Sequence, residues 1–118
     1  MAAGADEKWT IEKLDGANWT TWKFQMKHLL LAKELWGIVD RTEVLAEDAA
    51  ANVRAEFRKR SQKAFSIIVL AINASQLYLV TSSETPSDAW TALRNHYERD
   101  ITRKGRHDAE FSSRVLYE

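Results

Sequence analysis

Apolar residues recur at helical spacing in three long stretches of the chain, separated by short polar segments. The first stretch predicts a half-buried helix over residues 19–35, because its apolar side chains fall three or four residues apart. These side chains are Trp22, Met26, Leu29 and Leu30. Asn18 precedes the stretch, at the place where an N-cap side chain accepts a backbone hydrogen bond. Gly37 follows it, where a left-handed residue commonly ends a helix.

The second stretch predicts the central helix of the core, over residues 49–73. One face carries apolar residues from its start to its end. They are Val53, Phe57, Ala64, Ile68 and Ile72. The second half, residues 65–72, is apolar almost all round, which is typical of a helix buried on every side. Acidic residues before the stretch favour the positive end of the helix dipole.

Two further helices follow the central one. Ser75 is placed to cap a short helix over residues 76–80. The run Thr85-Pro86-Ser87-Asp88 is the strongest helix start in the chain, with an N-cap threonine, proline at the first helical position and an acid three residues after the cap. The helix that it starts presents apolar residues at helical spacing. They are Ala89, Trp90, Leu93 and Tyr97.

These elements predict one all-α domain, a compact bundle of about five helices. Residues 1–10 are expected to be a flexible leader and residues 11–100 the helical domain. Residues 101–118 form a basic C-terminal tail in which Gly105 predicts a break, with a weakly specified helix over 108–117. Asp15-Gly16 predicts a turn before the first helix.

Composition narrows the class of protein. The chain has 17 basic and 17 acidic residues, and this neutral total argues against a domain that coats nucleic acid with its whole surface. The absence of cysteine excludes a disulfide framework, a thiol nucleophile and a Cys-ligated zinc site. The histidines, His28, His96 and His107, show no zinc-type spacing. We therefore expect no enzyme, no catalytic or metal residues, no cofactor and no small-molecule substrate.

Targeting signals are missing from the sequence. The chain starts with Met-Ala followed by acids, which is unlike a secretory signal. Its longest purely apolar run, residues 67–72, is far shorter than the roughly 20 residues that span a bilayer. We expect a cytoplasmic or otherwise intracellular protein with no membrane partner, and a nuclear location stays open.

A basic strip covers the first half of the predicted central helix, against the single acid Glu56. It consists of Arg54, Arg58, Lys59, Arg60 and Lys63. The acids gather instead over residues 40–48, so the neutral total conceals a positive helix. Two interpretations stay open: the strip contacts the phosphates of RNA, or it is a solvated helix face, which is the commoner case. The strip is our candidate nucleic-acid contact.

The five tryptophans also have two interpretations, as core residues or as a platform for stacked bases. Four of them fall near helix ends or on apolar stripes, which favours the core. They are Trp19, Trp22, Trp36 and Trp90. Trp9 lies on no stripe.

One block of the sequence, LDGANWTTWKFQMKHLL from Leu14 onward, resembles the Gag region of copia-type LTR retrotransposon polyproteins. That family opens its capsid domain with a Leu-Asp-Gly-x-Asn-aromatic-x-x-Trp-Lys-x-x-Met pattern. The resemblance continues over residues 32–40 and returns over residues 85–97 as an Ala-Trp-x-x-Leu-x-x-x-aromatic helix. It covers the chain from about residue 11 to residue 99.

The resemblance implies a helical domain like the N-terminal domain of retroviral and retrotransposon capsids. The protein would be a structural Gag-type protein that self-associates into capsid-like particles and packages RNA. The implied fold-defining positions are Leu14, Asp15, Gly16, Asn18, Trp19, Trp22, Met26, Leu35, Trp36, Ala89, Trp90, Leu93 and Tyr97. Residues 101–118 depart from the family pattern, as expected of a truncated or domesticated copy. Two alternatives stay open: a nucleic-acid-binding module that uses the basic strip, and a domesticated adaptor that binds partner proteins.

Overall fold

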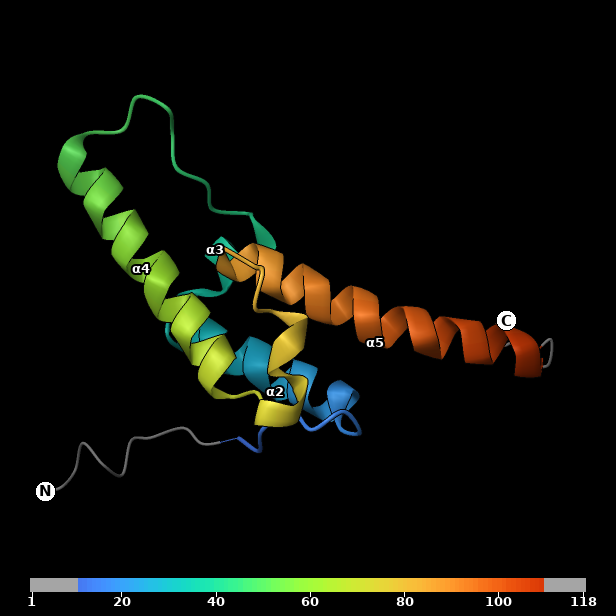
Figure 1. Ribbon diagram of the computed structural model, residues 1–118. Helices are drawn as coiled ribbons and strands as arrows, with labels where there is room; N and C mark the ends of the chain where they lie inside the picture. The colour runs from blue at the N-terminus through green and yellow to red at the C-terminus, as the bar shows by residue number, and fades with distance from the viewer. Residues whose placement is uncertain (1–10, 110–118) are drawn as a thin grey trace, which may run out of the picture.

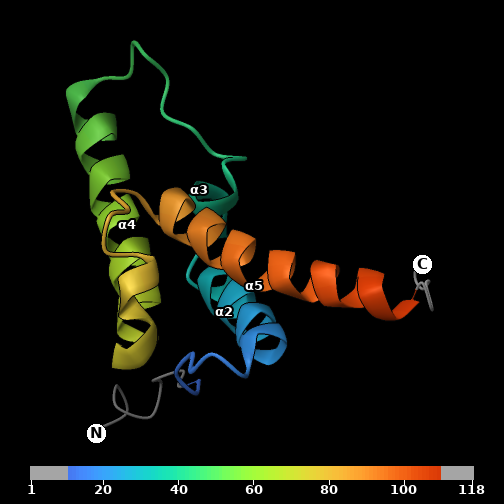
Figure 2. The same cartoon turned by 45° about the vertical axis from the view of Figure 1, so that its right-hand side comes forward.

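The computed structural model describes the backbone of residues 11–109 and the side chains of residues 11–99, and this part of the chain is helical (Figure 1). The helices are α2 (Trp19–Ala32), α3 (Trp36–Asp40), α4 (Ala51–Leu70), the 3₁₀ helix η1 (Ala74–Leu79) and α5 (Pro86–Ala109). The expected all-α bundle of about five helices is confirmed. Figures 1 and 2 show the lower half of α4 gathered with α2, α3 and the start of α5, while the upper half of α4 extends away.

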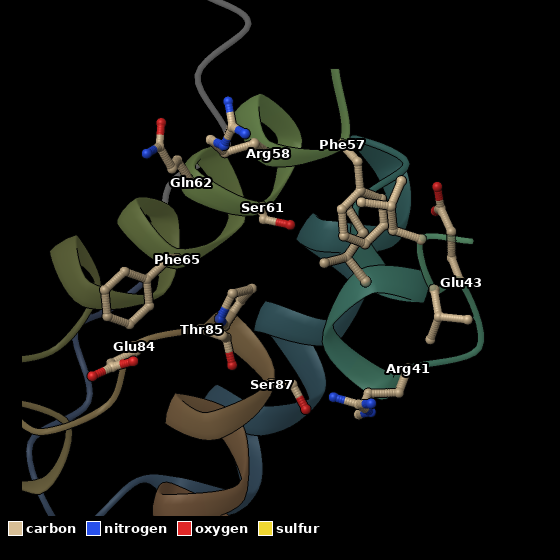
Figure 3. Close-up of a pocket in the computed structure, with 14 residues that line it drawn as sticks. Arg41, Glu43, Phe57, Arg58, Ser61, Gln62, Phe65, Glu84, Thr85 and Ser87 are labelled. Atoms are coloured by element: carbon tan, nitrogen blue, oxygen red, sulfur yellow. The ribbon is translucent and has the colours of Figure 1, made fainter. Parts of the chain in front are cut away.

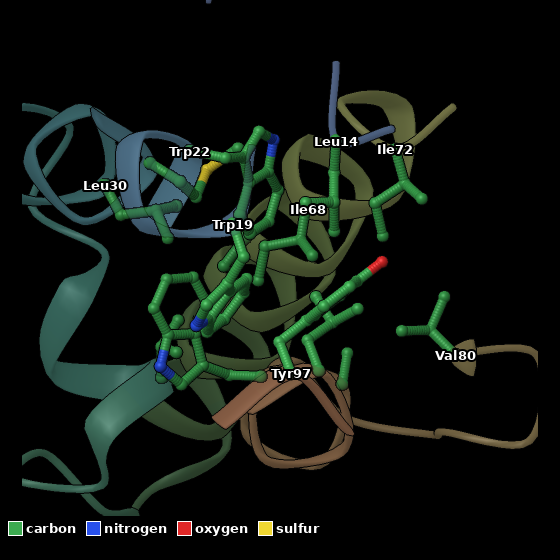
Figure 4. Packing of buried hydrophobic residues seen from close by; sticks show 14 of the residues in the cluster. Leu14, Trp19, Trp22, Leu30, Ile68, Ile72, Val80 and Tyr97 are labelled. Carbon is green, nitrogen blue, oxygen red and sulfur yellow. The ribbon is translucent and has the colours of Figure 1, made fainter. Parts of the chain in front are cut away.

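An aromatic cluster forms the centre of the core (Figure 4). The Trp19 and Trp22 rings from α2 lie 5.8 Å apart, and each lies 5.9 Å from the Trp90 ring of α5. Tyr97 stacks on Trp19 at 5.2 Å, and Trp36 meets Trp90 edge-on at 5.0 Å. The four tryptophans assigned to the core from their spacing therefore pack there together, and Trp9 lies outside the described residues.

The polar atoms of these rings have partners, as buried indoles and phenols require. The Trp22 indole N–H donates to the Ala71 carbonyl at 3.0 Å, which joins α2 to the end of α4. The Trp19 indole N–H donates to the Glu98 carboxylate at 3.2 Å. The Tyr97 hydroxyl donates to the side-chain carbonyl of Gln76 at 2.6 Å. Each bond joins two elements, so together they fix how the helices sit against one another.

The segment before α2 is held to the chain that follows α4. Leu14 donates to the Ala71 carbonyl at 2.9 Å and forms an isolated parallel bridge with Ile72. Gly16 has a φ of +98°, where a side chain would be strained, and the predicted turn at Asp15-Gly16 is confirmed. Asn18 occupies the N-cap position, but the prediction that its side chain caps the helix is wrong. Its amide oxygen instead accepts the N–H of Asp15 and closes the turn.

Helix α2 ends earlier than the sequence predicted, and Gly37 does not end it. Glu34 takes the left-handed conformation, with a φ of 62°. The Leu35 N–H donates to the Leu30 carbonyl at 2.8 Å and the Glu34 N–H donates to the Leu31 carbonyl at 3.0 Å, the pattern of a Schellman motif. Leu30 and Leu35 are both buried, as this motif favours. Gly37 lies inside α3, a short helix that the sequence analysis did not separate from the first.

Helix α4 and the turn after it correct two further expectations. The helix begins after Ala50, and the acids Glu47 and Asp48 precede it as expected. Its second half is not buried all round, because Leu70 is 73% exposed. The cap of the next helix is Asn73, whose side chain accepts the N–H of Ser75, so Ser75 is not the cap. Asn73 is favoured because an Asx side chain reaches the N–H two residues ahead.

Helix α5 begins as predicted and continues further than predicted. The Thr85 hydroxyl accepts the N–H of Asp88 at 3.0 Å, which confirms the N-cap. The predicted break at Gly105 is wrong, since α5 runs through Gly105 to Ala109. One glycine in a helix costs only about 1 kcal/mol relative to alanine, which a long helix can absorb. The expected leader, residues 1–10, and residues 110–118 of the expected tail lie outside the described residues.

Candidate functional site

The most distinctive feature outside the core is a projecting segment, which we call the arm: the loop of residues 41–50 and the part of α4 over residues 51–63. Figures 1 and 2 both show it extending away from the other helices. None of its residues is buried, whereas Ala64, the next residue of α4, is fully buried. We call the remainder of the described chain the body. The arm is therefore chain that the core does not cover.

Two arginines of the basic strip connect the two sides of the arm. The Arg60 guanidinium donates to both carboxylate oxygens of Glu43, at 2.5 and 3.0 Å, and to the Glu34 carbonyl. Arg54 donates to the carbonyls of Glu47 and Ala49 at 3.0 and 3.1 Å. The hydrogen bond from Arg60 lowers the pKa of Glu43 despite some desolvation of that carboxylate. These bonds hold the loop against the helix, so the arm has a defined shape.

The other three cations of the strip point into solvent. Arg58, Lys59 and Lys63 are exposed, and no ion pair involves them within the described part of the chain. Lys59 lies two residues from Phe57, which places it on the opposite side of α4. The strip predicted as one nucleic-acid contact is thus divided into two structural arginines and three solvated cations.

A groove of about 530 Å³ lies between the arm and the start of α5 (Figure 3). Figure 3 shows Phe57, Ser61 and Phe65 on its α4 side, and Thr85 and Ser87 on its α5 side. Its apolar lining comes from four parts of the chain: Ile38, Val44, Leu45, Phe57, Phe65 and Pro86. Charged side chains stand around it: Arg41, Glu43, Arg58 and Glu84. Such a lining suits an apolar side chain or helix face with polar flanks.

The fold-defining positions lie in the body, and none of them lines the groove. Nine are buried, namely Leu14, Trp19, Trp22, Met26, Leu35, Ala89, Trp90, Leu93 and Tyr97. Trp36 is half-buried against the core. Asp15, Gly16 and Asn18 form the turn before α2, where the Asp15 carboxylate also accepts the N–H of Ala17. The motif therefore builds the core and leaves the arm to other residues.

Sequence reasoning missed the groove. Val44 and Leu45 stand within an acidic stretch, and the only signal was that two apolar residues interrupt it. It also missed an exposed apolar stripe on α2, where Phe24 is 65% and Leu31 is 44% exposed and the Phe24 and His28 rings lie 4.7 Å apart.

The titratable side chains of the described residues show no cluster suited to a metal. His28 and His96 are exposed on different helices. No group of three or more His, Cys, Asp or Glu residues comes together among the side chains described. In the body, Lys23 of α2 forms an ion pair with Glu98 of α5. Desolvation raises the pKa of Glu98, but hydrogen bonds from Lys23 and Trp19 outweigh it and lower the pKa overall.

None of the helices in the described chain is long and apolar enough to span a membrane.

Comparison with protein families gives a match over most of the chain. Residues 26–111 match the family described as gag-polypeptide of LTR copia-type. The matched range includes the whole arm, both walls of the groove and most of the core. It begins near the end of the LDGANW block and runs past residue 100, where we expected a departure from the family pattern. No curated protein and no solved structure matches the chain.

Proposed function

The chain belongs to the gag-polypeptide family of LTR copia-type, and we propose that it is a structural protein that self-associates into capsid-like particles. The family match carries this proposal, because it extends over most of the chain. The family is a structural, non-catalytic one. Membership of this family supports a Gag-like structural role, and a structural protein of this kind acts by associating with other copies of itself.

The division into body and arm supports the proposal. The body buries its aromatic cluster within one copy of the chain. The arm exposes two apolar side chains: Val44, which lines the groove, is 62% exposed, and Val53, one turn of α4 before Phe57, is 49% exposed. Contiguous exposed apolar surface rimmed by polar residues commonly marks an association site. A chain whose core is complete within one copy, and whose arm exposes apolar surface, has the properties expected of a subunit of a larger assembly.

The experiment is sedimentation velocity of the purified, nuclease-treated chain over a wide range of concentration, with negative-stain microscopy of the heaviest fractions. We expect the mean sedimentation coefficient to rise with concentration and particles to form at the upper end. A chain that sediments as a monomer at every concentration, and forms no particles, would overturn the proposal.

The three solvated cations of the arm favour a second function, a weak contact to RNA. Arg58, Lys59 and Lys63 are free of ion pairs within the described residues. Three phosphate contacts to a single strand imply a slope of about −2 in a plot of log K against log salt. We expect the triple change to glutamate to abolish that slope, and the change Lys13→Glu, at an exposed cation of the body, to leave it unchanged. Absence of RNA binding at low salt would contradict this function.

A further inference from the structure

One apolar face runs along the whole length of α4. Val53, Phe57, Ala64 and Ile68 follow one another at spacings of four, seven and four residues, which places them on a single side of a helix, with the small polar Ser61 between Phe57 and Ala64. At the lower end of this face Ala64 and Ile68 are fully buried in the core. At its upper end Val53 is 49% exposed and Phe57 is only half-buried. The apolar face of α4 thus continues beyond Ala64, but the core does not bury it there.

The loop of the arm adds to this uncovered face. Val44 and Leu45 line the groove together with Phe57, so apolar surface continues from the helix to the loop. Arg54 and Arg60 hold the loop against α4, as described above. The surface is thus held in shape before any partner arrives, which reduces the entropy cost of binding.

The charges of the arm identify the partner. Its helix carries the exposed cation Arg58 at the groove, and its loop carries the exposed acids Glu47 and Asp48. In a two-fold dimer, the helix of each copy lies against the loop of the other. A patch with an apolar centre, a basic side and an acidic side can therefore bind a second copy of itself, because each basic side meets an acidic one. RNA would use only the basic side.

We propose that the arm is a self-association surface, and that it is occupied by the arm of a second copy of this chain in a two-fold dimer. The apolar face of each α4 covers that of its partner across the groove. The acidic loop of each copy lies against the basic side of the other helix. This inference rests on the proposed function and names the surface through which assembly begins.

A charge exchange tests the two-fold arrangement. One variant carries Arg58→Glu, and a second carries Glu47→Lys and Asp48→Lys. Each variant alone places like charges opposite each other, so we expect its dimer affinity to fall by about tenfold or more. In an equal mixture of the two, both contacts become attractive again, and we expect the affinity to return. Sedimentation velocity on nuclease-treated protein measures association, and circular dichroism verifies the fold.

A second test addresses the apolar centre. We expect Val53→Asp to abolish dimer formation, because it places a charge in the covered face. Leu70→Asp is the matched control: it lies on the same helix, is 73% exposed and stands outside the arm. We expect it to leave association unchanged.

The outcomes separate this inference from the proposed function. If the unmodified chain associates and the arm variants associate equally well, the inference is overturned and the proposed function stands. If each charge variant is weakened but the mixture does not recover, the two-fold arrangement is overturned. If the unmodified chain never associates, both proposals fall.

Discussion

The two halves of α4 share one apolar face but have different surroundings. In the lower half, Ala64 and Ile68 are completely buried against the aromatic cluster. In the upper half, Val53 on the same face is half exposed, and no residue of the arm is buried. The helix and its apolar face continue through both halves, but the covering elements differ, and the upper half also carries the basic strip. Periodicity therefore identifies the face that is suited to burial but not the chain that buries it.

The test with the largest expected effect truncates one apolar side chain to alanine at each end of the face. We expect Ile68→Ala to lower the free energy of unfolding by about 2–5 kcal/mol, because it leaves a cavity in a packed core. We expect Val53→Ala to change the unfolding free energy of the monomer by less than about 0.5 kcal/mol, as for other exposed positions. Urea denaturation at low protein concentration measures both. Equal losses would show that the upper half is also covered within one copy.

A second comparison concerns how the two long helices begin. The Thr85 hydroxyl caps α5 in the body, and we expect Thr85→Ala to lower the free energy of unfolding by about 1 kcal/mol. Helix α4 starts in the arm after Ala50, which offers no side-chain cap. We expect Ala50→Ser to add a cap worth up to about 1 kcal/mol to the local stability of the first turn. If the arm opens independently of the body, hydrogen exchange in the first turn of α4 should detect this gain. Global unfolding by urea should then show no change.

The link between α2 and α3 contains a strained residue. Glu34 adopts a left-handed conformation at the end of α2, which costs a residue with a side chain about 1–2 kcal/mol. Glycine avoids this cost but loses more entropy on folding, so we expect Glu34→Gly to stabilise the chain by about 0.5–1 kcal/mol. The Glu34 carbonyl that Arg60 contacts is backbone and is retained. A loss of stability in thermal denaturation would show that the Glu34 side chain has a role of its own.

The helices and buried residues of the body could be predicted from the sequence better than the positions where those helices end. The spacing of Trp22, Met26 and Leu30 was enough to identify a helix and its buried side, because nearby apolar residues pack wherever they face a core. The end of α2 could not be predicted from the preference for a glycine after the last turn of a helix. It depends on Leu35 packing against Leu30, and that contact overrides the preference for glycine.

The candidate site was less predictable because its contacts are long-range. Arg54 and Arg60 looked like Arg58 in the sequence, and nothing local reveals that they bind a loop. Arg60 meets Glu43 seventeen positions earlier. The groove depends on the same folding back of the loop, so its residues carry no motif. A charge pattern thus shows which side of a helix is basic, but not which cations remain available to a partner.

The smallest expected effect is a dependence on pH that both regions share. The pKa values of Glu98 in the body and Glu43 in the arm lie below their ordinary value of 4.5. The stability from these carboxylates is therefore present above about pH 4.5 and is lost as the pH falls through their folded-state pKa values. Both pairs are partly exposed, so we expect each to contribute less than about 1 kcal/mol.

The change Glu98→Gln separates the two carboxylates. We expect it to reduce the acid dependence of global unfolding, followed by denaturation at several pH values. Glu43→Gln should loosen the arm alone, because Glu43 and its partner Arg60 both belong to the arm. A global effect of Glu43→Gln equal to that of Glu98→Gln would mean that arm and body unfold as one unit.

The central claim is that the upper half of α4 is covered only when two copies meet. Amide hydrogen exchange along α4, measured at low and at high protein concentration, tests it most directly. We expect residues 64–70 to be protected at both concentrations, and residues 51–61 to gain protection only at the high one. Protection of residues 51–61 that does not change with concentration would contradict the claim.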